Sequence, residues 1–385
     1  MTLGACDPGR SYYVGELEPL PVAGATGVFA ASIDGHLIVG GGVWREDEGP
    51  GAPSDAIWSL DYRRKGRAWK REPGRLPRAL TFGTSVEVNG GALWIGGLAS
   101  SAAASVATSE TFFVRWKDGG VQLTPGPALP EARASAVAAR VASRVFVSCG
   151  NNAAEQATQT LFVLDLAAKD PTWARGPDLP GPARAMAMAG VIDATFYVVG
   201  GRGTAVLADA WAFDGQRWQS APMLDAPVCA APTPLLSVHD QVLVVGGDAD
   251  GVEGGQAPGP RLRSLAKDGE AWRAWPDLTV HRGPDPDQHP ELGTLPQVLA
   301  PVVRIDDFHA IVAGSIARSR SVLRAPVAEG PSLTSTNRIA LFVAGDADSK
   351  RALLVLLAIF VLAVVPTCAA VAYAFRVHAR KQAAS

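Results

Sequence analysis

The segment V-I-D-A-T-F-Y-V-V-G-G-R-G, at residues 191–203, is the clearest copy of a pattern that recurs along most of the chain. It predicts two short strands joined by a tight turn, the second of which ends in a pair of glycines. Glycine at the end of a strand permits a positive φ angle and a close approach by another backbone. Three further copies and two eroded ones are found at residues 33–41, 88–97, 238–247, 142–150 and 306–314.

Each copy is followed by a second pair of strands that completes a unit. A loop after the glycines leads to an aromatic strand and then to a tryptophan, as at residues 211–214 with Trp218. A Leu-Pro or Pro-Arg segment then precedes a strand of small residues, as at 185–191. We expect the tryptophans to pack between neighbouring units. The six glycine-pair positions begin at Gly40, Gly96, Cys149, Gly200, Gly246 and Ala313.

A period of about 50 residues with four strands is typical of Kelch blades arranged as a β-propeller, because one such unit cannot bury its own faces. The sequence therefore predicts an all-β fold, a six-bladed Kelch-type β-propeller over residues 11–328. Residues 11–20 resemble the second half of a unit, with Tyr13 at the tryptophan position, whereas residues 321–327 lack that strand. We expect the N-terminal strand to complete the sixth blade, since closure removes exposed sheet edges.

Composition limits the classes of partner. The 41 glycines and 29 prolines among 385 residues indicate many turns. The formal net charge of −2 gives no preference for nucleic acid or for an anionic surface, so no nucleic-acid partner is expected. The cysteines have no spacing typical of a metal site or a disulfide framework, so neither a metal nor a cofactor is expected. They are Cys6, Cys149, Cys229 and Cys368.

A transmembrane helix is predicted at residues 351–376, after a linker at 329–350 and before a basic tail at 377–385. Residues 352–375 carry no charged side chain, and about 20 apolar residues are enough to span a bilayer. We therefore expect a single-pass membrane protein of the bacterial cell envelope, attached through residues 352–375.

Two membrane topologies stay open. The positive charges that flank the helix favour a cytoplasmic C-terminus, which places the propeller outside and requires an export signal. Without such a signal, the helix inserts as a tail anchor and the propeller faces the cytoplasm. Residues 1–10 form an N-terminal tail in which L-G-A-C, at 3–6, resembles a bacterial lipoprotein cleavage box. Cys6 would then be lipidated if translation began upstream; the alternative is a tail in which this cysteine occurs by chance.

Three arginines precede predicted inner strands at similar distances from the glycine pairs, and they are Arg78, Arg133 and Arg184. Such positions fall near the mouth of the central channel, where converging guanidinium groups suit a carboxylate ligand. Arg202 and Asp248 directly follow glycine pairs and could reach the same ligand. The alternative is that each arginine braces the turn between two blades, and that Arg202 and Asp248 stabilise their own turns.

A histidine and carboxylate cluster lies around the proline-rich segment 282–296, with His281 and His289 near Asp285, Asp287 and Glu291. The cluster could hold a cation or contribute a general acid, but it has no spacing typical of metal ligands, so a solvated loop is the favoured interpretation. The chain also lacks a G-x-S-x-G motif, which argues against an ordinary serine hydrolase.

The order of these segments resembles that of bacterial Kelch proteins of the sialic-acid mutarotase (N-acetylneuraminate epimerase) family, in its cyclically permuted branch. The resemblance covers most of residues 15–325 and implies an isomerase that exchanges the anomers of N-acetylneuraminate or a related acidic sugar. The acidic sugar, or a protein ligand, would bind at the propeller mouth. The matching stretches are residues 18–42, 76–86, 181–189 and 226–248.

The chain departs from the family at the G-E-x-x-P-G-x-R-like motif, in which the resemblance implies a functional glutamate and arginine. The matching residues are Ser315 and Ser321, and Arg320 lies one position away. A serine cannot act as a carboxylate base, so a relocated acid or base would have to come from Glu291 or Asp248. Two functions therefore follow: a mutarotase with a relocated acid and base, or a catalytically inactive, membrane-tethered propeller that binds a glycan or a protein.

Overall fold

The computed structural model describes residues 11–17, 20–22, 24–45, 51–64, 68–100, 104–229, 233–234, 236–238, 241–245, 262–267, 269–274, 302–305, 308–312, 315–316, 334–335 and 339–345. The chain divides into two compact units, of which the larger is Val14–Phe342 and the smaller combines Met1–Tyr13 with Val343–Ser385. Every regular element among the described residues is a β-strand.

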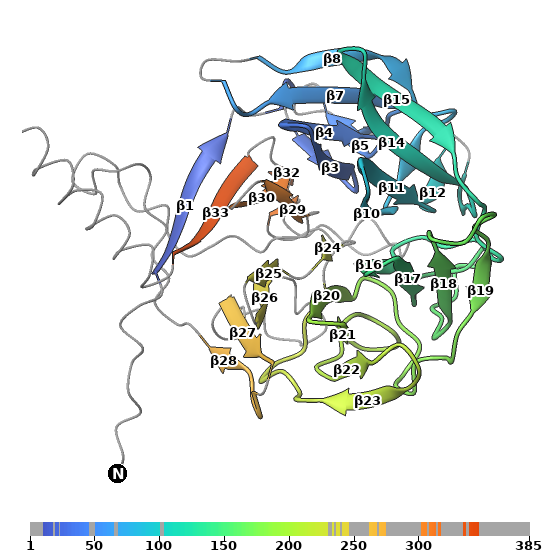
Figure 1. The fold of residues 1–385 in the computed structure, drawn as a ribbon, viewed down its shortest axis with the longest axis vertical. Helices are drawn as coiled ribbons and strands as arrows, with labels where there is room; N and C mark the ends of the chain where they lie inside the picture. Colours follow the sequence, from blue (N-terminus) through green and yellow to red (C-terminus); the bar gives the residue numbers. More distant parts are fainter. Residues whose placement is uncertain are drawn as a thin grey trace, which may run out of the picture. The chain divides into compact units, whose positions relative to one another are not determined.

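Six sheets follow one another along the chain, and we number them sheets 1 to 6. Figure 1 shows the first strand of each of sheets 1 to 5 toward the middle of the larger unit and the last strand toward its rim. Sheets 1 to 3 are, in hydrogen-bonded order, β3 (Phe29–Ile33), β4 (His36–Gly40), β7 (Ala56–Asp61) and β8 (Lys70–Arg75); β10 (Thr84–Val88), β11 (Gly91–Ile95), β14 (Thr111–Lys117) and β15 (Gly120–Pro125); and β16 (Val137–Val141), β17 (Arg144–Ser148), β18 (Leu161–Asp165) and β19 (Trp173–Arg175).

The remaining sheets follow the same plan of four successive hydrogen-bonded strands. Sheet 4 has an additional strand, β24 (Thr233–Pro234), which pairs in parallel with its first strand. Sheets 4 to 6 are β20 (Met188–Ile192), β21 (Thr195–Val199), β22 (Ala210–Phe213) and β23 (Trp218–Ala221); β25 (Leu236–Val238), β26 (Gln241–Val245), β27 (Leu262–Ala266) and β28 (Arg273–Ala274); and β29 (Val302–Ile305), β30 (Phe308–Val312), β33 (Ile339–Gly345) and β1 (Ser11–Leu17).

Small sheets form from the loops between second and third strands, and in sheets 1 and 2 a short strand that precedes the first strand of the sheet joins them. They are β2 (Gly24–Thr26) with β5 (Val43–Arg45) and β6 (Ala52–Pro53), β9 (Leu80–Thr81) with β12 (Leu98–Ser100) and β13 (Ser105–Ala107), and β31 (Ser315–Ile316) with β32 (Thr334–Ser335). In sheets 3 and 4, isolated bridges such as Ala134 with Asn151 and Ala185 with Arg202 take their place.

The glycine pairs occupy equivalent places in sheets 1 to 4. Both residues of each pair have positive φ angles, and the second residue donates its N–H to a carbonyl oxygen in the connection to the next sheet. The acceptors are Leu80, Arg133, Arg184 and Val228, at 2.7–2.8 Å. In sheet 1 the pair is Gly41–Gly42, so the predicted start at Gly40 is one residue early. Three consecutive glycines concealed this register, because any two of them fit the repeat pattern.

A chain of backbone hydrogen bonds links the starts of the first strands of sheets 1 to 4. Phe82 N–H donates to Gly27 O at 2.8 Å, Ser135 N–H to Phe82 O at 2.7 Å, and Met186 N–H to Ser135 O at 3.0 Å. All four residues have φ angles between 51° and 62°. Since left-handed backbone is costly for residues other than glycine, the bonds between sheets and the surrounding packing must stabilise it.

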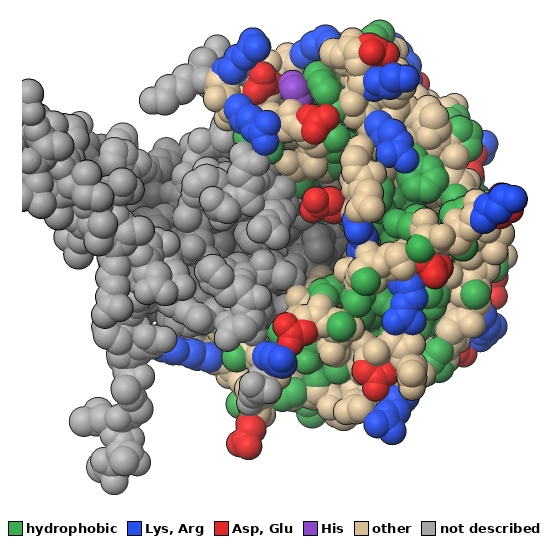
Figure 2. Space-filling model, viewed as in Figure 1, with side chains coloured by type: hydrophobic (Ala, Val, Ile, Leu, Met, Phe, Trp, Pro, Cys, Tyr) green, Lys and Arg blue, Asp and Glu red, His purple; other side chains and the backbone are tan. Residues whose placement is uncertain are grey.

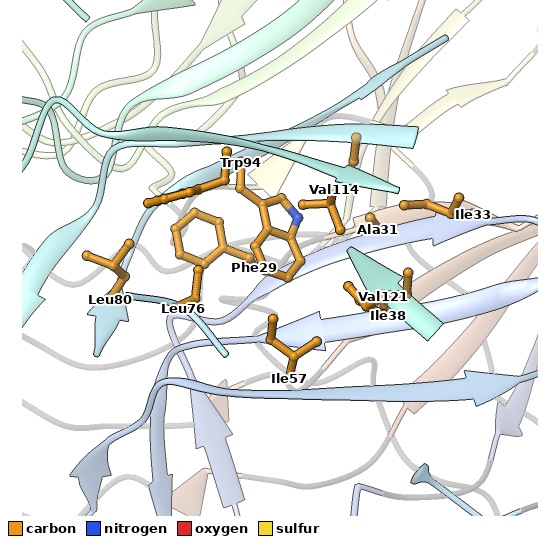
Figure 3. Packing of buried hydrophobic residues seen from close by; sticks show 12 residues of the cluster. Phe29, Ala31, Ile33, Ile38, Ile57, Leu76, Leu80, Trp94, Val114 and Val121 are labelled. Atoms are coloured by element: carbon orange, nitrogen blue, oxygen red, sulfur yellow. The ribbon is translucent and has the colours of Figure 1, made fainter. Parts of the chain in front are cut away.

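Apolar layers between successive sheets provide the core. The layer between sheets 1 and 2 joins Ile38 and Ile57 to Trp94, whose ring is stacked on Phe29 with the centroids 5.1 Å apart (Figure 3). Val303 of β29 packs in one cluster with Leu37 and Val39 of β4, so the sixth sheet contacts the first. Burial of this kind contributes about 25 cal/mol per Å² of apolar surface.

The tryptophans pack between neighbouring sheets, as predicted. Trp173 lies in the apolar cluster shared by sheets 2 and 3, and its indole N–H donates to Pro127 O at 2.8 Å. Trp218 and Trp272 make the same contact one and two sheets later, with Pro177 O and Pro222 O. The G-P-x-L motifs at 126–129 and 176–179, and A-P-M-L at 221–224, thus supply a proline carbonyl for the indole of the following sheet. Each also supplies a buried leucine, such as Leu129 or Leu179.

Sheet 6 combines strands from both ends of the chain. The N-terminal strand β1 lies beside β33 in the order β1-β33-β30-β29, which confirms that it completes the sixth sheet. The third strand, β33, lies within the segment 329–350 that the sequence predicts as a linker. The described residues include no helix long and apolar enough to cross a membrane. The predicted helix at 351–376 and the tails at 1–10 and 377–385 lie outside the described residues.

Candidate functional site

Four loops and three connections lie at one end of sheets 1 to 4. Because successive strands alternate in direction, the loops between second and third strands lie at the same end as the connections that lead into the next sheet. We call this end the site face. In the described part of the chain it comprises the loop residues 41–45, 51–55, 96–100, 104–110, 149–160 and 200–209 and the connections 76–83, 126–136 and 176–187. Arg78, Arg133, Arg184 and Arg202 all belong to it.

Arg184 is completely buried beside Asp209. Its two terminal nitrogens donate to Asp209 Oδ1 and Oδ2 at 2.6 and 2.7 Å, and further bonds reach Gly200 O and Pro182 O. The side chain of Arg184 is 0% exposed and that of Asp209 is 23% exposed. Because these contacts use the donors of the guanidinium group within the chain, they favour the bracing role over ligand binding.

The Asp209 carboxylate stays ionised in this setting. Desolvation by burial raises its pKa, but the hydrogen bonds from Arg184 and from Trp211 Nε1 outweigh this effect, and the net pKa lies below the ordinary value. Its two oxygens accept three short hydrogen bonds, at 2.6–2.7 Å, from the Arg184 and Trp211 side chains, so Asp209 is poorly placed to remove a proton from a ligand.

The lowered pKa of Asp209 predicts an acid-sensitive contribution to stability. Since the folded chain keeps this carboxylate charged at a pH where the unfolded chain protonates it, the contribution is fully present above the ordinary pKa of about 4. It is lost as the pH falls through the lower folded value. Urea unfolding of the natural chain and of Asp209→Asn between pH 7 and pH 3 measures this, and the stability difference should shrink as the pH falls. A difference that grows on acidification would contradict the assignment.

Arg133 occupies the equivalent place one sheet earlier. Its side chain is 1% exposed and donates to Thr160 Oγ1 at 2.7 Å, Ala132 O at 2.7 Å and Glu131 Oε2 at 2.8 Å. The guanidinium carbon also lies 5.1 Å from the centre of the Phe162 ring. Like Arg184, Arg133 joins a connection to the sheet that follows it.

Arg78 differs from the other two in exposure. Its side chain is 55% exposed, and Nη2 donates to Glu110 Oε1 at 3.1 Å. Leu80, not Arg78, stands at the backbone position equivalent to Arg133 and Arg184, because Leu80 O accepts the N–H of the glycine pair. Arg78 therefore lies two residues before the position that Arg133 and Arg184 occupy in their connections. Leu80 occupies that position in this connection and is buried.

Of the other predicted site residues, the structure describes Arg202 and Ser315 but not the remaining four. Arg202 is exposed and makes no side-chain hydrogen bond or ion pair with another described residue, while its backbone bridges Ala185 and Val206. Ser315 lies in β31, opposite Ser335. Asp248, Glu291, Arg320 and Ser321 lie outside the described residues.

The acceptors for these arginines were missed by the sequence reasoning. Glu110, Thr160 and Asp209 occupy one repeat position, since each carbonyl oxygen accepts the N–H of the first residue of its glycine pair. The signal was present in the sequence, because each residue directly precedes the third strand and stands two positions before an aromatic residue. Without the fold, nothing indicated that this position faces an arginine from the preceding connection.

The buried Cys149 adds no reactive nucleophile, and the acidic and histidine side chains add no metal site among the described residues. Burial raises the pKa of the Cys149 thiol to about 11, against smaller opposing effects of a hydrogen bond with Ser148 and of Arg184 and Arg133, so the thiol stays protonated near neutral pH. A protonated, buried thiol is a poor nucleophile. No group of three His, Cys, Asp or Glu side chains suited to a metal ion occurs within the described ranges.

Comparison with known proteins establishes the fold alone. No family model and no curated protein matches the chain. Among solved structures, that of YjhT aligns with a TM-score of 0.59 at 13% identity, covering 78% of this chain and 93% of that one. The larger unit is a Kelch-type β-propeller.

Sheets 1 to 6 are accordingly the blades of this propeller. At each junction between successive blades from blade 1 to blade 5, one pair of side chains joins the connection to the blade that follows it. The last pair reverses the order, with the carboxylate of Asp225 in the connection and Arg263 in the following blade. The repeated pairs stabilise the propeller where blades meet, and among the three predicted arginines only Arg78 combines such a pair with an exposed guanidinium group.

Proposed function

We propose that this protein is a propeller of the sialic-acid mutarotase type, which binds N-acetylneuraminate or a related acidic sugar on the site face and exchanges its anomers. The observation that carries the proposal is a Kelch-type propeller with two exposed arginines, Arg78 and Arg202, on the end formed by loops and connections. The sequence resemblance to sialic-acid mutarotases supplies the substrate class.

The positions of individual charged side chains, rather than the net charge of the chain, must select such a ligand. Figure 2 shows acidic and basic side chains interspersed over the coloured part of the visible face, without a broad patch of one sign. On the site face, a carboxylate would be recognised by individual guanidinium donors, which bind carboxylates in a planar, two-bonded geometry. Anomer exchange further requires an acid and a base near the hemiketal carbon to open and reclose the ring.

A second function is favoured by Ser315, which stands where the resemblance implies a glutamate. In this alternative the propeller has lost catalysis and binds a glycan or a protein at the membrane, to which residues 352–375 attach it. Alkaline extraction of membranes tests the attachment: the full-length chain should stay with the membrane pellet, and its release into the supernatant would contradict a transmembrane anchor.

Proton NMR distinguishes the two functions. The α and β anomers of N-acetylneuraminate would be followed with the full-length chain, purified in a mild non-ionic detergent, at catalytic concentration. We expect exchange to be accelerated above the spontaneous rate, and heat-unfolded protein at the same concentration serves as the control. Line broadening of the sugar signals without acceleration would favour the binding propeller. Signals that stay sharp and exchange at the spontaneous rate would argue against an acidic-sugar ligand.

A further inference from the structure

Three arginines in connections between blades each bind the residue that precedes the third strand of the next blade. One of these three pairs is open to solvent. The pairs are Arg78 with Glu110, Arg133 with Thr160 and Arg184 with Asp209. The side chains of Arg133 and Arg184 are 1% and 0% exposed, whereas that of Arg78 is 55% exposed. A position that braces two blades elsewhere is thus accessible at the junction of blades 1 and 2.

The Arg78 guanidinium group retains unused donors. Arg184 makes four side-chain hydrogen bonds, two of them to one carboxylate, and Arg133 makes three. Among the described residues, Arg78 makes a single hydrogen bond, from Nη2 to Glu110. The remaining N–H groups can donate to a second carboxylate, and an arginine fork holds a carboxylate by two parallel bonds.

Glu110 is itself held in place beside this fork. Its backbone N–H donates to Thr108 Oγ1 at 3.2 Å, and the Thr108 hydroxyl donates to Glu110 Oε2 at 3.3 Å. The Glu110 carbonyl oxygen accepts the N–H of Gly96 at 2.8 Å, which fixes the backbone at the end of the loop. The side chain is 32% exposed, so its carboxylate is available to a ligand that binds Arg78.

We propose that Arg78 and Glu110 together form the point that binds the acidic sugar, with Arg78 holding the carboxylate and Glu110 facing the adjacent hydroxyl group. This inference rests on the proposed function and deepens it. In N-acetylneuraminate the carboxylate and the anomeric hydroxyl are attached to the same carbon, so a base beside the bound carboxylate also lies beside that hydroxyl. The pair therefore supplies both a carboxylate-binding group and a base for the anomeric hydroxyl at one place.

The proton balance of the exchange is simple. The Glu110 carboxylate accepts the proton of the anomeric hydroxyl, the bond between the anomeric carbon and the ring oxygen breaks, and the ring oxygen takes a proton from water. The hydroxide left behind recovers the proton from Glu110. Rotation of the open-chain ketone and the reverse steps give the other anomer, with no net change in the protein.

Saturation-transfer NMR with the full-length chain tests the pair, using N-acetylneuraminate and its methyl ester as probes. The variant is Arg78→Gln, and Arg75→Gln is a matched control because Arg75 is equally exposed and pairs with Asp55 at 3.3 Å on the same face. We expect Arg78→Gln to weaken binding of the acid about tenfold or more, since a hydrogen bond between charged groups is lost. The ester should bind the natural chain and Arg78→Gln alike, and Arg75→Gln should match the natural chain.

A third variant separates binding from exchange. Glu110→Gln keeps an oxygen that accepts from Arg78 but cannot take a proton, so it should bind the acid and lose acceleration of anomer exchange. Unchanged acid binding by Arg78→Gln, or equal effects of Arg78→Gln on acid and ester, would overturn the pair while leaving the proposed function intact. Failure of the natural chain to bind either probe would overturn both. Thermal unfolding of each variant confirms that it is folded.

Discussion

An Arg184→Met chain is expected to unfold with a free energy about 2 to 4 kcal/mol below that of the natural chain. The substitution leaves the Asp209 carboxylate without its two-bonded partner and removes the donors to Gly200 O and Pro182 O. The estimate lies toward the lower part of the range for broken buried ion pairs, because Asp209 keeps some contact with water. Urea unfolding of the full-length chain, followed by tryptophan fluorescence, measures the change.

Arg78→Met provides the matched control for this prediction. It removes the same side chain from the repeat-equivalent but exposed pair with Glu110, and exposed pairs contribute about 0 to 1 kcal/mol. A double variant, Arg184→Met with Asp209→Leu, should recover part of the loss, because it leaves no unpaired charge. If Arg184→Met and Arg78→Met had equal effects on stability, the bracing role of Arg184 would be wrong.

Replacing Gly150 by alanine is expected to lower the free energy of unfolding by about 3 kcal/mol, from left-handed strain and from overpacking. Gly150 has a φ angle of 86°, and a Cβ there would lie 2.8 Å from Ala134 O and 2.8 Å from Ala136 Cβ. Both atoms belong to the connection that leads into the first strand of the same blade, so relief requires backbone movement. The first residue of the pair is Cys149 in blade 3, so glycine occupies only the second position of the pair in this blade.

Gly119→Ala is a control that separates the cost of left-handed backbone from the cost of crowding around a new Cβ. Gly119 has a φ angle of 77°, close to that of Gly150, but a Cβ there would meet no atom within 4 Å. Its substitution should cost about 1 kcal/mol, from backbone conformation alone. Thermal and urea unfolding of the two variants would show the difference. Equal losses would mean that close approach at the second glycine contributes nothing to the propeller.

Much of the fold followed from local chemistry repeated along the chain. The Asp34-Gly35 and Asp118-Gly119 turns have positive φ angles at both residues, as tight hairpins require. The Asp-Gly sequence by itself indicates such a turn. The glycine pairs, the tryptophans between blades and the N-terminal strand of blade 6 were predicted for the same reason, since each depends on a residue type at a repeated position. The third strand of blade 6, β33, was missed because its apolar residues lie after an interruption in the repeat.

The sequence by itself determined a Kelch-type architecture and the end of the blades that carries the arginines, because strand period, turn residues and repeat spacing are properties of short segments. Only the tertiary structure decided which of three similar arginines is exposed. Arg78, Arg133 and Arg184 look alike in the sequence, yet a shift of two residues buries Leu80 in place of Arg78. Exposure depends on what the neighbouring blade places against a side chain, and segments distant in the sequence supply those contacts.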